Sequence, residues 1–340
     1  MKRVSKQMMT PAAYKSKLGI VETEMAIKKV KDYFESNLSE VLKVVRVSAP
    51  LFLQEGTGLN DNLNGTERVV SFDALDVKDK KLEIVQSLAK WKRSALAKYQ
   101  FPVGTGLYTD MKAIRRDEIL DNLHSMFVDQ WDWEKVIVKQ TRTVETLKDE
   151  VEKLYKALTA TEQYVHQLYP SLQPILPKSI HFITSQELEN MYPSLTPKER
   201  EDKIAKKHGA VFLMQIGGML NSGTKHDGRS PDYDDWSLNG DIIVWFPILE
   251  RAFELSSMGI RVDKKALLKQ LKESNCEDRK NLAYHQAVLR GDLPFTIGGG
   301  IGQSRLCMFL LQKAHIGEVH VSVWNDEILK ECREANIQLL

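Results

Sequence analysis

The feature that most constrains this chain is a series of strand-like segments, several of which follow one another with only short turns between them. They alternate apolar and polar residues and are rich in β-branched and aromatic side chains. They cover residues 68–73, 82–86, 106–114, 125–133, 210–216, 240–246 and 251–262. Parallel strands need crossover connections, usually helices, whereas antiparallel neighbours can be joined by short turns. The pattern therefore favours an antiparallel sheet flanked by helices over a doubly wound parallel sheet.

Helical periodicity is clearest over residues 20–42, where apolar residues recur every three or four positions and form one stripe. The next segment, 43–53, alternates like a strand and is interrupted near Pro50. Further helices are expected at 87–99, 143–168, 263–273, 279–290 and 303–313. No repeat, low-complexity tract or clear linker divides the 340 residues. We expect a single domain over residues 16–340, preceded by a mobile N-terminal extension, residues 1–15.

Composition places the chain among globular proteins, with 42% hydrophobic and 28% charged residues and a net charge of +2. Because the charges nearly cancel, no broad cationic surface is expected to hold nucleic acid. No apolar run approaches the roughly 18 residues of a membrane span. Three widely spaced cysteines indicate a reducing compartment rather than a disulfide framework. We expect a cytoplasmic protein; a basic, acid-free stretch of 21 residues at the start leaves an organellar presequence as the alternative.

A glycine-rich segment, residues 296–302, directly precedes the apolar helical pattern of residues 303–313. Glycines let backbone amides approach a ligand, and a helix N-terminus favours an anion. The segment completes neither a P-loop nor Gly-x-Gly-x-x-Gly. Arg305 lies in the first helical turn, where the helix dipole disfavours a cation. It therefore suggests a bound phosphate, with an arginine extending to solvent as the alternative.

The strand at 125–133 carries two kinds of face. Two-residue periodicity places Gln130 and Asp132 on one face and Trp131 and Trp133 on the other, which we expect to be buried. The polar face could be solvent-exposed or a binding floor.

On the last of these strands, Glu254 alternates with Leu255 and Ser257 and is a natural oxygen ligand for Mg²⁺, or else a partner for Arg261. The three cations of helix 87–99, Lys90, Lys92 and Arg93, are most simply a solvated face.

The irregular segment 220–239 contains four aspartates within nine residues, and it is either a solvated acidic loop or a mobile lid. Nucleophilic and zinc chemistry have little support. The chain has no Gly-x-Ser-x-Gly elbow and no His-Glu-x-x-His motif, and its eight histidines lack ligand spacing.

The order of these motifs resembles a known family. Arg115-x-x-Glu118, a strand with Gln130-x-Asp132, Glu254 on a late strand, and Gly300-x-Gly-x-x-Arg305-Leu are similar to the catalytic core of aspartate-type class II aminoacyl-tRNA synthetases. More specifically, the chain resembles the aspartate-ammonia ligases, the ammonia-dependent asparagine synthetases, from about residue 16 to its end. The blocks that carry this resemblance are DNLNG, QSLAKWKR, GLYTDMKA, VDQWDWE, PDYDDWS, LNGDIIVW, FELSSMGIRV and TIGGGIGQSRL.

The resemblance implies an α+β class II synthetase-like fold, with an antiparallel sheet flanked by helices, acting as a homodimer. It implies L-aspartate, ATP, Mg²⁺ and ammonia as ligands, and L-asparagine, AMP and pyrophosphate as products of a reaction through β-aspartyl-AMP. A β-carboxylate is a poor acyl donor, so it must first attack the α-phosphorus of ATP. That step brings two anions together and needs fixed cations and metal.

The same resemblance assigns roles around ATP. Arg115 is expected to hold the α-phosphate and the aspartate carboxylate, Glu118 to face adenine, and Arg305 to hold the distal phosphates. Ser257 and Gly302 are expected to complete the ATP site, and Glu254 to bind Mg²⁺.

Around aspartate, Lys92 matches the lysine that receives the substrate side-chain carboxylate in the related synthetase. Ser87, Gln130 and Asp132 are expected to bind substrate polar groups, with Asp132 a candidate for the ammonium end and, with Arg115 and Arg305, for catalysis. Asp61 and Asp234 are candidates for the α-amino group or the incoming ammonia, because a carboxylate can both attract ammonium and accept its proton.

Two departures from the synthetases matter. Pro247 stands where they carry an acidic metal ligand, which makes Asp241 the nearest substitute, and Ala89 stands where they carry a glutamine.

A tRNA-charging synthetase is the rival enzyme, although the chain has no room for an anticodon-binding barrel. A degenerate binding protein is the non-enzymatic alternative. Neither nucleic acid nor a membrane is expected as a partner.

Overall fold

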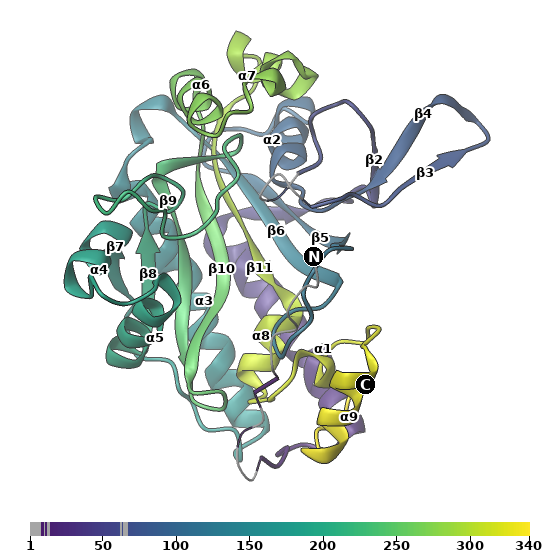
Figure 1. The fold of residues 1–340 in the computed structure, drawn as a ribbon, viewed down its shortest axis with the longest axis vertical. Coiled ribbons are helices and arrows are strands. Elements are labelled where there is room, and N and C mark those ends of the chain that lie inside the picture. The colour runs from purple at the N-terminus through teal and green to yellow at the C-terminus, as the bar shows by residue number, and fades with distance from the viewer. Residues whose placement is uncertain (1–7, 10, 12–13, 62, 64–66) are drawn as a thin grey trace.

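The computed structural model describes residues 8–9, 11, 14–61, 63 and 67–340. Its centre is an eight-stranded sheet (Figure 1). The strands, in spatial order, are β1 (Val44–Arg46), β5 (Gly106–Ile114), β6 (Phe127–Ile137), β11 (Phe295–Gly302), β10 (Arg251–Arg261), β9 (Asp234–Phe246), β8 (Ala210–Met214) and β7 (His181–Thr184). The pairs β1–β5 and β7–β8 are parallel, and the other five are antiparallel. The expected mostly antiparallel architecture is confirmed.

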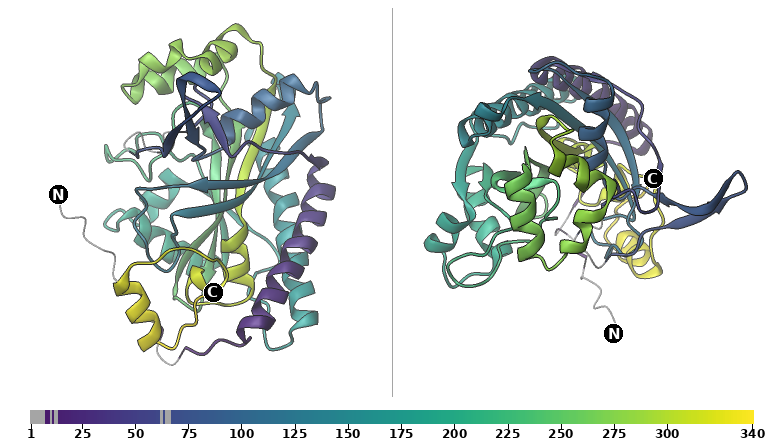
Figure 2. Two further views of the ribbon diagram at one scale, coloured as in Figure 1. Left: turned by 90° about the vertical axis from the view of Figure 1, so that its right-hand side faces the viewer. Right: turned by 90° about the horizontal axis from the view of Figure 1, so that it is seen from above.

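One face of the sheet is covered by helices α1 (Ile20–Leu42), α3 (Val144–Leu168) and α8 (Gln303–Leu310) (Figure 2). The apolar stripe expected on α1 packs inward, and Phe34 lies 4.8 Å from the Trp131 ring. Trp131 and Trp133 are both buried in this layer, as the alternation in β6 predicts. The opposite face of β6, with Gln130 and Asp132, is thereby left for other contacts.

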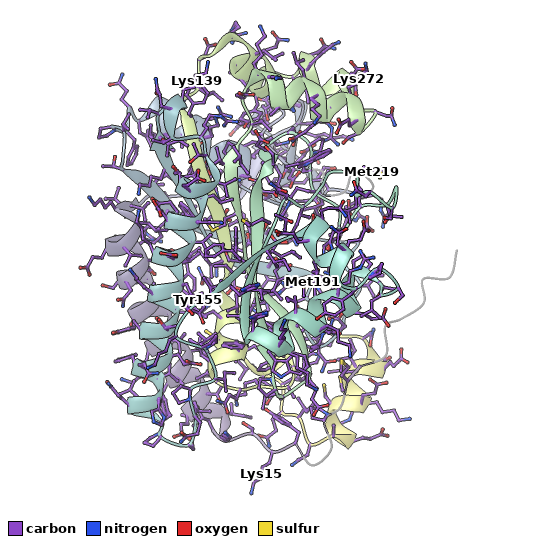
Figure 3. The ribbon with its side chains drawn as sticks, turned by 90° about the vertical axis from the view of Figure 1, so that its left-hand side faces the viewer. Lys15, Lys139, Tyr155, Met191, Met219 and Lys272 are labelled. Atoms are coloured by element: carbon purple, nitrogen blue, oxygen red, sulfur yellow. The ribbon has the colours of Figure 1, made fainter. Side chains whose placement is uncertain are left out.

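That opposite face is covered only at its two sides. Helix α2 (Ala89–Lys98) packs on β5 and β6, while α4 (Ser185–Met191) and α5 (Pro197–His208) pack on β7, β8 and β9. Figure 3 shows Tyr155 on α3 to the left of Met191, which lies at the end of α4. Helix α5 also contacts β10, so the part of this face left between the two helical groups lies over β11 and the adjoining parts of β6 and β10.

Two smaller units extend from this body. Strands β2 (Phe52–Gln54), β3 (Ser71–Ala74) and β4 (Val77–Ile84) form a separate sheet that projects away from it (Figures 1 and 2). Helices α6 (Lys264–Glu273) and α7 (Ala283–Arg290), joined by the 3₁₀ turn η2 (Glu277–Asn281), form a cap at one end of the sheet. The remaining short elements are η1 (Lys139–Thr141), η3 (Ile316–Glu318) and α9 (Asp326–Glu334).

The main difference from expectation concerns the glycine-rich residues 296–302, which belong to the central strand β11 although no strand was predicted there. A Cβ on Gly298 would lie 2.0 Å from Glu134 Oε2, and one on Gly299 would lie 2.6 Å from Met258 Cβ. Neighbouring strands thus require glycine here, independently of any ligand. The segments β7, α4, α5 and α9 were not predicted from the sequence, and β3, β4 and β9 have different bounds from those expected.

The expectations for the cysteines and for membrane helices agree with the structure, whereas part of the expected N-terminal extension lies outside the described residues. The three cysteines are free, and no helix in the described part of the chain is long and apolar enough to cross a membrane. Of the expected N-terminal extension, residues 1–7, 10 and 12–13 lie outside the described residues, as do residues 62, 64 and 65 of the DNLNG block and residue 66 after it. Met9 is described, and its backbone exchanges two hydrogen bonds with the Asn122 side chain.

Candidate active site

A cavity of about 320 Å³ opens on the uncovered middle of the sheet. Its lining comes from β6, β10 and β11, from the loop after β5, and from the segment that precedes β9. Twelve of the thirteen residues singled out from the sequence line it: Asp61, Ser87, Lys92, Arg115, Glu118, Gln130, Asp132, Asp234, Glu254, Ser257, Gly302 and Arg305. Asp241 does not. The resemblance therefore selected residues from distant parts of the chain that fold into one cavity.

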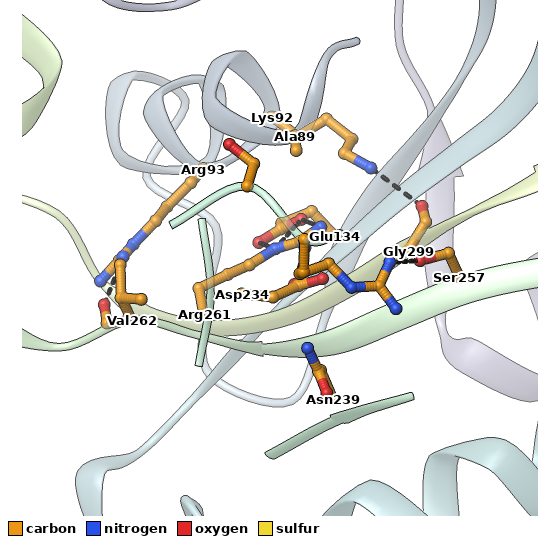
Figure 4. Close-up of polar contacts among 12 residues, drawn as sticks. Ala89, Lys92, Arg93, Glu134, Asp234, Asn239, Ser257, Arg261, Val262 and Gly299 are labelled. Atoms are coloured by element: carbon orange, nitrogen blue, oxygen red, sulfur yellow. Dashed lines mark hydrogen bonds and ion pairs between the residues drawn. The ribbon is translucent and has the colours of Figure 1, made fainter. Parts of the chain in front are cut away.

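Lys92 reaches the cavity from α2. Its ammonium group donates to the Asp132 carboxylate. It also donates, at 2.9 Å, to the Gly299 carbonyl oxygen (Figure 4). Burial lowers the pKa of Lys92, although Asp132 opposes the shift. Lys90 and Arg93 on the same helix are also buried, so the solvated-face interpretation of α2 is wrong. The second oxygen of Asp132 is buried and has no partner among the described residues.

Beside Lys92 lies a cation that the sequence analysis considered only as a partner for Glu254. Arg261, at the end of β10, donates to both oxygens of Glu134, with the shortest distance 2.7 Å, and to Asp234 (Figure 4). All three side chains are buried, and Arg261 lines the cavity. Glu134 and Asp234 hold the guanidinium of Arg261 beside β11, the strand whose Gly299 carbonyl oxygen accepts a hydrogen bond from Lys92. A hint was present in the sequence, since Glu134 continues the alternation of Gln130 and Asp132.

Strand β10 departs from simple alternation. Its register with β9 shifts between Glu254 and Ser256, which marks a bulge. Glu254 and Ser257 both line the cavity as a result, although strict alternation would place them on opposite faces. Simple alternation from the sequence was wrong at this point, because a bulge depends on how strands pair.

Arg305 extends from the first turn of α8 toward Glu254. Its Nη1 donates to the Glu254 carbonyl oxygen at 3.2 Å and lies 3.7 Å from the carboxylate, while Nη2 lies 2.9 Å from His124 Nε2. His124 was missed by the sequence analysis, and its Nδ1 lies 2.7 Å from Asp121. Burial raises the pKa of Glu254, but Arg305, Lys198 and Arg229 outweigh this and lower it overall. Glu254 is thus held as an anion.

Arg115 and Asp61 both carry buried polar atoms without a partner in the described part of the chain, the Nε of Arg115 and one oxygen of Asp61. The other oxygen of Asp61 accepts from Ser230 Oγ at 3.2 Å. Burial raises the pKa of Asp61 despite the nearby Lys90. Buried polar groups are normally hydrogen-bonded, so such atoms at a cavity wall are suited to a ligand.

Asp241, expected from the sequence to share a metal with Glu254, lies on β9 and accepts from Arg229 Nη2 at 2.6 Å. Burial raises the pKa of Asp241 to about 6, while Arg229 opposes the shift. Arg229 lines the cavity and was missed by the sequence analysis, because an irregular loop carries no periodicity that would orient it. Among the described residues, no group of three or more His, Cys, Asp or Glu side chains is placed to hold a metal ion.

Comparisons with known proteins agree with this geometry. The family model described as aspartate-ammonia ligase matches residues 21–336. The chain belongs to the aspartate-ammonia ligase family. It is 60% identical over 330 residues to the aspartate-ammonia ligase of Ruminiclostridium cellulolyticum, covering 97% of this chain and 98% of that one. It is 61% identical over 328 residues to that of Fusobacterium nucleatum, covering 96% and 100%.

Solved structures show the fold that this family shares. The asparaginyl-tRNA synthetase of Entamoeba histolytica, in complex with asparaginyl-adenylate, matches with a TM-score of 0.65 at 13% identity over 88% of this chain and 66% of that one. The Pyrococcus horikoshii asparaginyl-tRNA synthetase, also with asparaginyl-adenylate, gives 0.65 at 16% identity over 88% and 68%. The expected class II synthetase fold is confirmed.

Proposed function

We propose that this chain carries out its family's reaction, the ATP-dependent synthesis of L-asparagine from L-aspartate and ammonia, in the cavity described above and through β-aspartyl-AMP. Family membership carries the overall reaction. The observation that favours this cavity as its location is the set of five cations that line it, Lys92, Arg115, Arg229, Arg261 and Arg305. A site that joins a carboxylate to a triphosphate needs such a set.

The proposed reaction has two steps. An oxygen of the aspartate β-carboxylate forms a bond to the α-phosphorus, and the bond from that phosphorus to the bridging oxygen of pyrophosphate breaks. Ammonia then attacks the β-carbonyl carbon, AMP leaves with the carboxylate oxygen, and the nitrogen loses a proton. Both reactants in the first step are anions, so positive groups held in place before the reaction stabilise the charge that gathers at phosphorus.

For ATP, we propose Arg115 at the α-phosphate and the reacting carboxylate, Arg305 at the distal phosphates and Glu118 at adenine, with Ser257 and Gly302 completing the site. The buried Nε of Arg115, which has no partner among the described residues, supports its role. The contact of Arg305 with His124 supports a guanidinium held in a defined orientation. Together they would orient the triphosphate so that pyrophosphate can leave.

For aspartate, we propose Lys92 as the carboxylate anchor, Gln130, Asp132 and Ser87 as polar contacts, and Arg261 as a second cation beside Lys92. A substrate carboxylate would replace part of the interaction that Lys92 now makes with Asp132. The unpartnered oxygen of Asp132 is suited to an ammonium group.

For ammonia, we propose Asp61 as the receiving group. Its free oxygen is buried at the cavity wall, and its raised pKa makes it a better proton acceptor than an ordinary carboxylate. Asp234, the other candidate, already accepts from Arg261 and is proposed for the substrate α-amino group.

Mg²⁺ is proposed at Glu254. Proteins usually hold this ion with one or two carboxylates plus substrate phosphates, and the Glu254 side chain is 44% exposed in the cavity region. Bound there, the ion would neutralise charge on the phosphates. Asp241, the second proposed ligand, would first have to exchange Arg229 for the metal.

We further propose that the enzyme is a cytoplasmic homodimer. The sheet formed by β2, β3 and β4 projects from the body and exposes Leu75 (94%), Phe52 (45%) and Phe72 (37%). Exposed apolar groups on a projecting arm are typical of a protein interface. Light scattering of the wild type and of Leu75→Asp tests this, with a lower mass expected for the variant if the arm contributes.

The deciding experiment measures AMP and asparagine made by the purified protein from aspartate and Mg-ATP with ammonium, glutamine or tRNA. Equal amounts of AMP and asparagine with ammonium alone are expected. Aspartate-dependent pyrophosphate exchange, with an adenylate that reacts only with tRNA, would make the chain a tRNA synthetase. Binding of the substrates without any turnover would make it a degenerate paralogue. Arg305→Ala should abolish adenylate formation in a folded protein, and an active variant would refute the phosphate assignment.

A further inference from the structure

Arg229 is the cavity cation that the resemblance did not assign. It comes from the irregular segment between β8 and β9, and its side chain is only 9% exposed. Nη2 donates to Asp241 Oδ1 at 2.6 Å, and Nη1 donates to Ser257 Oγ. Asp241 lies on β9 and Ser257 on β10, where their Cα atoms are register partners. The guanidinium therefore connects β9 and β10 through one hydrogen bond to each strand.

Arg229 contacts Asp241, the carboxylate that the sequence analysis named as a substitute metal ligand. The resemblance implied that substitution because this chain has Pro247 where the related synthetases were expected to carry an acidic ligand. In this structure a guanidinium already neutralises Asp241. It also lies close enough to Glu254 to lower the pKa of that carboxyl. A positive charge is thus built into the protein beside the proposed Mg²⁺ ligand.

Arg229 also has hydrogen-bonding capacity left. A guanidinium carries five N–H donors, and two are used on Ser257 and Asp241. The Nε is buried and has no partner in the described part of the chain, although the side chain lines the cavity. A buried donor without a partner destabilises the protein, and a ligand acceptor would relieve that cost. Arginine presents its donors in a planar fork that suits phosphate oxygens.

We propose that Arg229 is a further catalytic residue, whose guanidinium stays on Asp241 and Ser257 while its free donors bind phosphate oxygens of ATP, so that Asp241 is not a ligand of the ion on Glu254. This rests on the proposed function, because it assumes that ATP binds in this cavity. It goes beyond that function by assigning Asp241 to an arginine rather than to a metal. One divalent ion per active site, on Glu254 and the phosphates, is then sufficient.

The test counts bound metal directly. Manganese(II) would be titrated into the full-length enzyme with saturating α,β-methylene-ATP, which cannot lose pyrophosphate, and free Mn²⁺ followed by electron paramagnetic resonance. The expected result is one Mn²⁺ per site, bound with affinity within threefold, in the wild type and in Asp241→Asn. Two ions in the wild type with one lost in Asp241→Asn, or a single ion bound at least tenfold more weakly by Asp241→Asn, would overturn the proposal, since Asp241 would then be a metal ligand.

The second readout separates phosphate binding from mere loop anchoring. Arg229→Gln should weaken binding of the analogue at least tenfold and lower kcat at least 100-fold, with the KM for aspartate within threefold of wild type. Arg229→Lys, which keeps the charge, should recover part of the affinity. Lys225→Gln alters the same loop at a residue that packs on the Trp236 ring, and serves as the control with unchanged kinetics.

Wild-type affinity for the analogue in a folded Arg229→Gln protein would overturn the role of Arg229. That outcome differs from failure of the proposed function, in which the wild type itself makes no asparagine and AMP from aspartate, ATP and ammonium.

Discussion

Replacing Gly298 with alanine tests whether β11 is fitted to the buried pair formed by Glu134 and Arg261. The added Cβ would lie 2.0 Å from Glu134 Oε2 and 2.6 Å from the Trp133 carbonyl oxygen. Ordinary contact begins near 3.4 Å, so the carboxylate oxygen must retreat by about 1.4 Å. The same oxygen accepts from Arg261 at 2.7 and 3.1 Å, so a movement of that size disturbs both bonds.

The expected cost follows from these contacts. Overpacking a core costs about 1–3 kcal/mol, and losing a hydrogen bond to a charged group costs about 1.5–3 kcal/mol. We therefore expect Gly298→Ala to lose about 3–5 kcal/mol of the free energy of unfolding, a large part of the roughly 5–15 kcal/mol of an ordinary domain. Because Arg261 lines the cavity, its displacement should also raise the KM for aspartate at least tenfold.

Urea unfolding and asparagine-synthesis kinetics at a temperature where the variant stays folded would measure both effects. Gly218→Ala is the matched control, because a Cβ there meets nothing within 4 Å. It should stay within about 0.5 kcal/mol of the wild type. If Gly298→Ala matched this control in stability and in KM, Glu134 could not lie where we place it.

Three further changes test other parts of the molecule. Lys92→Met should cost about 3–5 kcal/mol by leaving Asp132 buried without its cation, and adding Asp132→Asn should restore the urea midpoint but not asparagine synthesis; restored synthesis would exclude Lys92 from substrate binding. Burial lowers the pKa of His315 to about 4, so the unfolded chain takes up a proton first and stability should fall by up to about 3 kcal/mol between pH 6.5 and 4. His315→Asn should flatten that fall in pH-dependent unfolding, and an unchanged slope would contradict this origin. Thr196→Ala removes the capping box of α5 and should cost about 1 kcal/mol in thermal unfolding with unchanged kinetics, whereas altered kinetics would link α5 to the cavity.

The sequence predicts those elements in which apolar side chains recur at a regular spacing. Helix α1 has the bounds expected from its stripe, and β5 has the expected bounds as well. Helix α5 was missed although Thr196, Pro197 and Glu199 form a start signal that could have been recognised. Strand β11 was missed for a different reason, because a run of glycines has no side-chain period and only its neighbours make it a strand.

The residues of the site also divide into those that a periodic pattern predicts and those that it does not. Alternation places Gln130 and Asp132 on the face opposite Trp131, and this is confirmed. The resemblance supplied the residues that alternation alone could not connect, such as Asp61 and Arg305. The shared orientation of Glu254 and Ser257 could not be predicted, since it depends on a bulge formed by strand pairing. The position of Arg229 depends on the course of a loop, which no local pattern specifies.

The glycines of β11 also limit how the pocket of such an enzyme can diversify. A side chain on Gly299 would meet the backbone of Ser257 and the Cβ of Met258, neither of which can move aside without shifting the sheet. The three nearest atoms to a Cβ on Gly300 would all belong to the end of the flexible Gln130 side chain, the first of them at 2.8 Å. The accessible route to a reshaped pocket is therefore a paired change at 300 and 130, with the shorter residue at 130 introduced first. Laboratory evolution toward a bulkier or shorter acidic substrate should therefore change position 130 before position 300.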